Sequence, residues 1–131
     1  MLTELSHIGV AVDNIEDFVV QMAESFGVSV PAIVEHPERR IKLAVMTIGG
    51  VSFEILEESN PEGMLARYVS QHGPGLHHIG FLSSDLNTDM EVMKERNITF
   101  LSETPVTGLR GKRIAFAAEN NQSGINFELS E

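Results

Sequence analysis

Hydrophobic and polar positions alternate over two short stretches of the chain that resemble each other. The sequence Leu-Ser-His-Ile-Gly-Val at positions 5–10 returns as Leu-His-His-Ile-Gly-Phe at positions 76–81. Alternation with a period of two is typical of a β-strand, whose side chains point to opposite faces in turn. An internal repeat indicates that a chain contains two copies of one structural unit. We therefore predict two halves of the same architecture.

Each copy of the repeat is followed by apolar residues three and four positions apart. This spacing predicts helices over 15–26 and 86–97, and a short linking helix between Met64 and Val69. Asp and Asn side chains cap the first turn of a helix, and Gly or Asn favours its end. The residues in these places are Asp13 or Asn14 with Gly27 at the first helix, and Asp85 with Asn97 at the second.

Further alternating stretches predict the strands that complete each half. They cover 28–35, 41–48 and 52–57 in the first half, and 98–101, 113–118 and 126–131 in the second. The predicted fold class is α+β, with two βαβββ modules forming a curved mixed sheet. One domain would span residues 1–131, with module 1 at about 1–60, a linker at about 61–74 and module 2 at about 75–131.

Strand parity identifies candidate chemistry on the face of the sheet that the helices do not cover. One His and one Glu from each half share this face: His7, Glu54, His78 and Glu128. A single such residue is more often an ordinary core or surface residue, but the repeat of both at equivalent positions favours a shared site. Gly9 and Gly80 would leave room beside them. Two imidazoles and two carboxylates suit one divalent ion, such as cobalt, zinc, nickel or manganese, in a concavity with open coordination positions.

Composition and charge narrow the classes of partner. The 131 residues include 19 Asp and Glu against nine Lys and Arg, a formal charge of −10, which disfavours nucleic acid and anionic membranes. There is no Cys, so disulfides, thiolate ligands and thiol nucleophiles are excluded. No basic leader with an apolar core and no long apolar run occurs, so we expect a soluble, cytoplasmic protein.

At these residues the chain resembles the vicinal oxygen chelate superfamily, also called the glyoxalase/bleomycin resistance/dioxygenase superfamily. Its members pair βαβββ modules around a metal ion. The resemblance covers nearly the whole chain and is strongest with the methylmalonyl-CoA epimerases. The stretches that carry it are 5–12, 75–79, 101–103 and 108–112.

This resemblance implies a glyoxalase-like fold, with the four His and Glu residues above as metal ligands. It also implies a metal-dependent epimerase of an acyl-CoA, with methylmalonyl-CoA as the expected substrate. The proton α to the thioester would be removed through a metal-stabilised enolate. Glu128 is the expected first base and Glu54 its partner, because Leu43 stands where some of these epimerases carry a further glutamate.

A basic cluster in a glycine-rich loop is the candidate site for the anionic groups of an acyl-CoA. It consists of Arg110, Lys112 and Arg113. A substrate clamp and a solvated turn explain this cluster about equally well. We expect the clamp to bind a phosphate or carboxylate.

Two other functions of the same superfamily stay open. Glyoxalase I (lactoylglutathione lyase) also uses two His and two Glu ligands, although its usual Asp-Pro-x-Gly ending is absent here. A non-catalytic antibiotic-binding protein has the same fold but commonly lacks the ligands. By analogy with the relatives, we expect a homodimer that acts on a small thioester.

Overall fold

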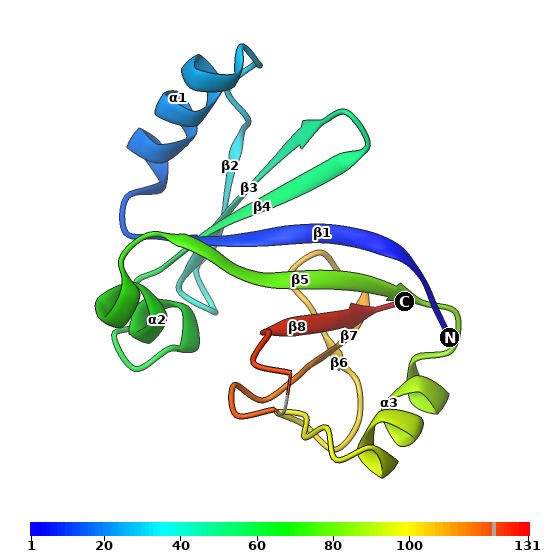
Figure 1. Cartoon of the computed structure of the whole chain (residues 1–131). Helices are drawn as coiled ribbons and strands as arrows, with labels where there is room; N and C mark the ends of the chain where they lie inside the picture. The colour runs from blue at the N-terminus through cyan, green and yellow to red at the C-terminus, as the bar shows by residue number, and fades with distance from the viewer. Residues whose placement is uncertain (122) are drawn as a thin grey trace. The chain divides into compact units, whose positions relative to one another are not determined.

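The computed structural model describes residues 1–121 and 123–131. It divides into two compact units, whose elements are labelled in Figure 1. Unit 1 contains Met1–His7 and His78–Glu131, and unit 2 contains Ile8–His77. Strand β1 (Leu2–Val12) supplies its first six residues to unit 1 and the rest to unit 2. The first strand of the chain thus belongs partly with the second sequence repeat.

Unit 2 contains three complete strands, the later part of β1 and two helices. The elements are α1 (Ile15–Phe26), β2 (Ile33–His36), β3 (Ile41–Ile48), β4 (Val51–Glu58) and α2 (Met64–His72). The strand order is β2-β3-β4-β1, in which β1 runs parallel to β4 and the other pairs are antiparallel. This arrangement is one βαβββ module followed by the linking helix.

The second module repeats the same topology. Its elements are β5 (Gly75–Ser83), α3 (Leu86–Glu95), β6 (Val106–Thr107), β7 (Arg113–Phe116) and β8 (Phe127–Ser130). The order is β5-β8-β7-β6, with β5 parallel to β8 and antiparallel pairing elsewhere. The α+β class with two βαβββ modules is confirmed. In the described part of the chain, no helix has both the length and the apolar character needed to cross a bilayer.

The predicted helix caps are confirmed at both modules. The side chain of Asn14 accepts a hydrogen bond from the Asp17 amide, and Gly27 ends α1 in the left-handed region at φ 67°. Asp85 accepts one from the Thr88 amide at the start of α3. Each cap satisfies a backbone donor that the first turn of a helix leaves unpaired.

Helix α2 is capped from a distance, which the sequence pattern did not reveal. Its N-cap residue is Gly63, which has no side chain to accept a hydrogen bond. Oε1 of Glu58, at the end of β4, accepts from the amides of Leu65 at 3.0 Å and Ala66 at 3.3 Å instead. Since Glu58 lies an even number of residues from Glu54, α2 is tied to the face of β4 that carries Glu54.

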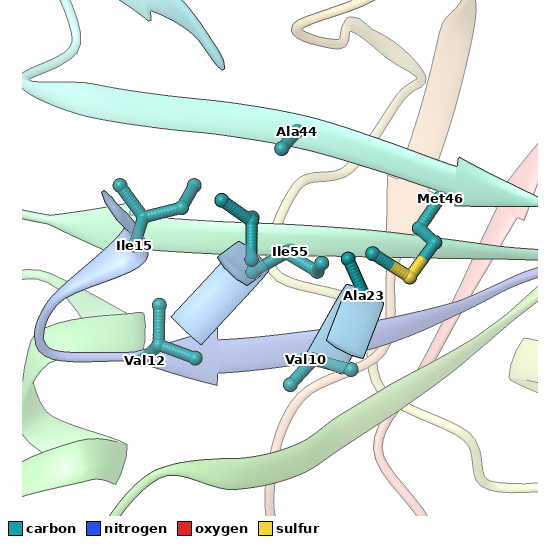
Figure 2. Packing of buried hydrophobic residues seen from close by; sticks show 8 residues of the cluster. Val10, Val12, Ile15, Ala23, Ala44, Met46 and Ile55 are labelled. Atoms are coloured by element: carbon teal, nitrogen blue, oxygen red, sulfur yellow. The ribbon is translucent and has the colours of Figure 1, made fainter. Parts of the chain in front are cut away.

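The core of unit 2 lies between α1 and the opposite face of its strands, as Figure 2 shows. Ile15 and Val19 of α1 pack there with Ile55 of β4, all three with almost no exposed surface. Burying an aliphatic side chain of this size contributes about 1.5–3 kcal/mol. The remaining buried members are Val10, Val12, Ala23, Ala44 and Met46. The parity predicted for β1 and β4 is therefore confirmed on this face.

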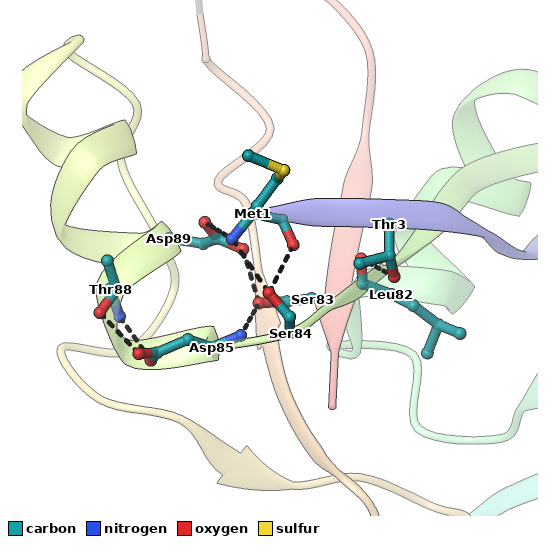
Figure 3. Close-up of polar contacts among 8 residues, drawn as sticks. All are labelled: Met1, Thr3, Leu82, Ser83, Ser84, Asp85, Thr88 and Asp89. Carbon is teal, nitrogen blue, oxygen red and sulfur yellow. Dashed lines mark hydrogen bonds and ion pairs between the residues drawn. The ribbon is translucent and has the colours of Figure 1, made fainter.

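Unit 1 has its own core beneath α3 and a polar network beside it. Leu86 and Met90 pack against Ala115, Phe127 and Leu129. Figure 3 shows the network, in which the Met1 ammonium pairs with Asp89, whose carboxylate also accepts from Ser83 Oγ at 2.6 Å. The Ser84 amide donates to the Met1 carbonyl at 3.1 Å. The first residues of β1 are thus fastened to the end of β5.

Two predicted strands are wrong in extent. The strand predicted over 28–35 is confined to β2 (Ile33–His36), and residues 28–32 are not extended in a ladder. The strand predicted over 98–101 is reduced to one bridge, between Phe100 and Ala117, and β6 pairs with β7 instead. In both cases apolar residues led to the prediction of a strand. Val28 packs beside the core of unit 2 and Ile98 beside the core of unit 1, but neither lies in a strand of the sheet.

Candidate metal centre

Two buried imidazoles of unit 1 face each other. Nε2 of His7 on β1 lies 3.1 Å from Nε2 of His78 on β5, and the two rings are nearly perpendicular. Only 3% of His7 and 5% of His78 is exposed. Buried imidazoles with their nitrogens directed at one point are the arrangement from which a metal ion is bound.

A carboxylate of the same unit lies near one of these imidazoles. Oε1 of Glu128 lies 3.8 Å from Nε2 of His7. Glu128 is placed by the parallel pairing of β8 with β5, in which it lies opposite Gly80, two residues after His78. His7 is therefore close to both of the other ligands predicted in unit 1, at 3.1 Å from His78 and 3.8 Å from Glu128.

Gly80 is required by the ring of His7. A Cβ atom on Gly80 would lie 2.2 Å from Cε1 and 2.3 Å from Nδ1 of His7, closer than real side chains approach. Because the obstacle is a buried ring, a substitution here would displace His7. The room that the sequence predicted beside the His residues is confirmed at this position.

The donor distances fit a divalent ion of the first transition row. Two donors, each about 2.1 Å from one ion, lie about 3.0 Å apart at a right angle and about 4.2 Å apart when opposite. The observed separations of 3.1 and 3.8 Å fall within this range. Imidazole and carboxylate together suit zinc, cobalt, nickel or manganese.

Two neighbours of the His residues could not be identified by sequence reasoning. Ser6 Oγ lies 3.1 Å from Nδ1 of His7, so an Nδ1–H donor to Ser6 would keep Nε2 unprotonated, the form that binds a metal. The ring of Phe116 meets that of His78 edge to face, with centroids 4.9 Å apart. Phe116 lies opposite Glu128 in the β7–β8 pair, so this aromatic ring shares the ligand face. Such neighbours orient ligands and exclude water.

Glu54 occupies the equivalent position in unit 2. It pairs in register with Gly9 of β1, as Glu128 pairs with Gly80 of β5. On its other side it faces Val45 of β3, and its side chain is half-buried. The two modules therefore carry the same Gly–Glu register.

Leu43 lies on this same face and is 6% exposed. It pairs with Leu56 of β4, two residues beyond Glu54. Because a leucine side chain has no ionisable group, this position cannot transfer a proton.

The basic cluster is divided by the structure. Arg110 and Lys112 lie in an exposed turn after β6, which the Gly108 amide closes by donating to the Lys112 carbonyl at 2.8 Å. Arg113 alternates with Ile114 and so shares the face of Ala115, which packs under α3. Its guanidinium pairs with Glu131 and donates to Asn87 of α3. These partners lie on the side opposite Glu128, and a role of Arg113 toward a substrate stays a prediction.

A family model supports the assignment that the geometry suggests. The model described as the Glyoxalase/Bleomycin resistance protein/Dioxygenase superfamily matches residues 6–116. The chain belongs to this superfamily. Its paired βαβββ modules are the glyoxalase-like fold predicted from the repeat.

Three individual proteins show which members of the superfamily the chain is similar to. The uncharacterised Bacillus subtilis protein YqjC is 27% identical over 130 residues, covering 99% of this chain and 93% of the relative. The mitochondrial methylmalonyl-CoA epimerase of Bos taurus is 25% identical over 131 residues, covering 99% and 75%. A variant of the Streptomyces coelicolor epimerase, solved with 2-nitronate-propionyl-CoA, superposes with a TM-score of 0.88 at 25% identity, covering 99% and 94%. The chain is thus similar over almost its whole length to known epimerases.

Proposed function

We propose that this protein is a metal-dependent epimerase of an acyl-CoA, with methylmalonyl-CoA as substrate. The observation that carries the proposal is the pair of buried imidazoles of His7 and His78, whose Nε2 atoms lie 3.1 Å apart, with Oε1 of Glu128 3.8 Å from Nε2 of His7. The methylmalonyl-CoA epimerases among the relatives support an isomerase of the epimerase type. Neither feature alone specifies the reaction, because the fold serves several activities.

The proposed ligand set consists of those three residues and Glu54. The shared Gly–Glu register of the two modules supports the inclusion of Glu54. When bound, a divalent ion supplies a Lewis acid that stabilises negative charge developing on a thioester oxygen. The buried imidazoles hold this charge away from bulk water, where screening would weaken its effect.

The two glutamates are the proposed proton-transfer groups. Inversion at the carbon between the thioester and the carboxylate begins when a glutamate oxygen takes the α proton and the C–H electron pair moves toward the thioester carbonyl. A proton returned to the opposite side of the same carbon completes the inversion. Glu54 and Glu128 are the proposed carboxylates for these two transfers, because Leu43 cannot accept a proton.

The exposed turn after β6 is the proposed contact for the anionic part of the substrate. Arg110 and Lys112 bring two positive charges into a protein of formal charge −10. This local excess would offset the repulsion that the whole protein exerts on a phosphate. Arg113 is retained as a member of the clamp only as a prediction, since it has partners on the other face. The homodimer and the cytoplasmic location also stay predictions.

A parallel assay of two substrates tests the proposed function. Metal-loaded protein is given racemic methylmalonyl-CoA in one reaction and the glutathione hemithioacetal of methylglyoxal in another. Turnover of the acyl-CoA that stops on chelation and returns with added metal is the expected result. Turnover of the hemithioacetal alone would assign glyoxalase I, and metal binding without turnover of either would favour the non-catalytic alternative.

A further inference from the structure

Unit 2 contains an open apolar groove beside α1. It has a volume of about 770 Å³ and is lined by residues of α1, β1, the β3–β4 hairpin and the start of β5, all of them within Ile8–His77. We propose that two copies of this chain meet through this groove in a twofold-symmetric dimer. The inference goes beyond the proposed function, because it uses neither the metal site nor the substrate.

Two large apolar side chains of the groove are exposed to solvent. Phe26, at the end of α1, is 60% exposed, and Leu76, at the start of β5, is 65% exposed. Full burial of a side chain of this size contributes about 1.5–3 kcal/mol relative to full exposure. An apolar patch that is left open in one chain marks a surface at which a partner or ligand binds.

The charge distribution favours a second copy as the occupant. The chain has a formal charge of −10, so two copies repel each other through most of their surfaces. Among the described residues that line the groove none is charged, and the polar side chains are those of Gln21 and Ser25. Two copies can therefore meet here without placing like charges opposite each other. An anionic ligand, in contrast, would find no positive charge in this lining.

The shape of the patch suits a twofold axis. Each copy uses the same patch in such an interface, so the patch must carry both a projection and the hollow that receives it. Phe26 and Leu76 are the projections, and the groove beside them has room for the same two side chains of another copy. A stable interface buries about 800 Å² on each partner, roughly a tenth of the 7441 Å² that this chain exposes. The groove supplies the apolar centre of such an interface.

The corresponding part of unit 1 is polar instead. Equivalent positions of the two modules are 71 residues apart. The equivalent of Phe18 is Asp89, which unit 1 occupies with its own Met1 ammonium and Ser83 hydroxyl. The equivalent of Phe26 is the exposed Asn97. The βαβββ architecture therefore does not require an apolar helix end, and the groove is a specific property of unit 2.

Glutamate substitutions at the two exposed side chains test the interface. Phe26→Glu and Leu76→Glu each place one negative charge per copy at the proposed contact. Val20→Glu is the matched control, because Val20 lies on the same helix as Phe26, is 42% exposed and does not line the groove. Circular dichroism verifies that each variant is folded. The mass in solution is then measured by sedimentation equilibrium over a range of protein concentrations, without metal or substrate.

The wild-type protein and Val20→Glu are expected to sediment with twice the mass of one chain. In Phe26→Glu and Leu76→Glu the dissociation constant of the dimer should rise at least about a hundredfold. A wild-type protein that stays monomeric, or a dimer that both groove variants leave unchanged, would overturn the proposal. A monomer that binds the apolar dye anilinonaphthalene sulfonate, and loses it in Phe26→Glu, would assign the groove to an apolar small ligand instead. None of these outcomes affects the proposed epimerase function.

Discussion

The two βαβββ modules share one register and differ in what surrounds it. In both, a glutamate of the last strand lies opposite a glycine of the first, at Glu54 with Gly9 and at Glu128 with Gly80. Glu128 lies in the unit that contains both His residues, whereas Glu54 lies in the other unit, with Gly9 and Val45 as its ladder partners. The sequence repeat therefore places the same residue types at equivalent positions of the two modules. Because the first strand contributes residues to both units, the His and Glu residues are divided unequally between them.

The cause of this inequality is the first strand. It runs through both units, and the residues before Ile8 belong to unit 1. His7 is therefore a residue of the first repeat that lies beside the His of the second. Variants at the shared positions test this difference between the modules.

Removal of His7 should have the largest effect. His7→Ala deletes a buried imidazole and leaves His78 without its neighbour at 3.1 Å. We expect metal affinity to fall by about a thousandfold or more, a free-energy change of about 4 kcal/mol. Calorimetric titration checks this value, with His72→Ala as the control because His72 is exposed. Equal metal content in His7→Ala and the wild type would remove the proposed site.

A methyl group at Gly80 should weaken the site without removing any ligand. In Gly80→Ala the new Cβ meets the His7 ring, and such overpacking lowers the free energy of unfolding by about 1–3 kcal/mol. We expect both a lower melting temperature and about tenfold weaker metal binding. Gly75→Ala is the matched control on the same strand, since nothing lies within 4 Å of its added Cβ. Unchanged affinity in Gly80→Ala would contradict the close approach of His7.

The polar network that fastens β1 to unit 1 should depend on pH. Burial raises the pKa of Asp89, but hydrogen bonds from the Met1 ammonium and Ser83 outweigh it and leave the pKa below its usual 3.8. Folding therefore favours the charged form, which stabilises the protein above pH 3.8, and this contribution is lost as the pH falls through the lower folded-state pKa.

Asp89→Asn tests this contribution directly. We expect it to lower the free energy of unfolding at pH 7 by about 1–3 kcal/mol. Denaturant titrations should show the difference from wild type shrinking as the pH falls below the usual range of an Asp carboxyl. Glu95→Gln on the exposed side of the same helix is the control. A difference that stayed constant with pH would show that charge is not its source.

The smallest effects are expected in the basic loop. If the turn binds an anionic group of the substrate, Arg110→Ala and Lys112→Ala should each raise KM by about three- to tenfold and reduce its dependence on salt. Arg113→Ala should instead lower stability by at most about 1 kcal/mol, because its partners lie at an exposed surface. Steady-state kinetics at two salt concentrations separate these outcomes. A larger increase of KM in Arg113→Ala than in the other two variants would show that Arg113 contributes to substrate binding.

Much of the fold could be predicted because strand parity and helix caps are local properties. Asn14, Gly27 and Asp85 act within one turn of their helices, so their roles are visible in the sequence. The extent of β2 and the existence of β6 could not be predicted, since a strand needs a partner and ladder pairing is decided elsewhere in the chain.

Part of the site was also visible in the sequence, and part was not. Parity applied to His7, His78 and Glu128 predicted their common face, but it was not applied to Arg113, whose alternation with Ile114 indicates the other face. The cap that Glu58 supplies to α2 was missed because only the path of the turn after β4 brings its carboxylate to the Leu65 amide, seven residues later. Assignment of the ligands to compact units likewise required the structure.

Solvent exchange at the α carbon tests metal-dependent proton transfer by this site. A single stereoisomer of methylmalonyl-CoA is incubated in D₂O with metal-loaded wild-type protein, and loss of the α-proton signal is followed by proton NMR. We expect deuterium to enter together with inversion, with both processes stopped by chelation and slowed at least about a hundredfold in Glu128→Gln. Exchange that continues at the wild-type rate in the chelated protein, or no exchange with the metal-loaded protein, would contradict the account.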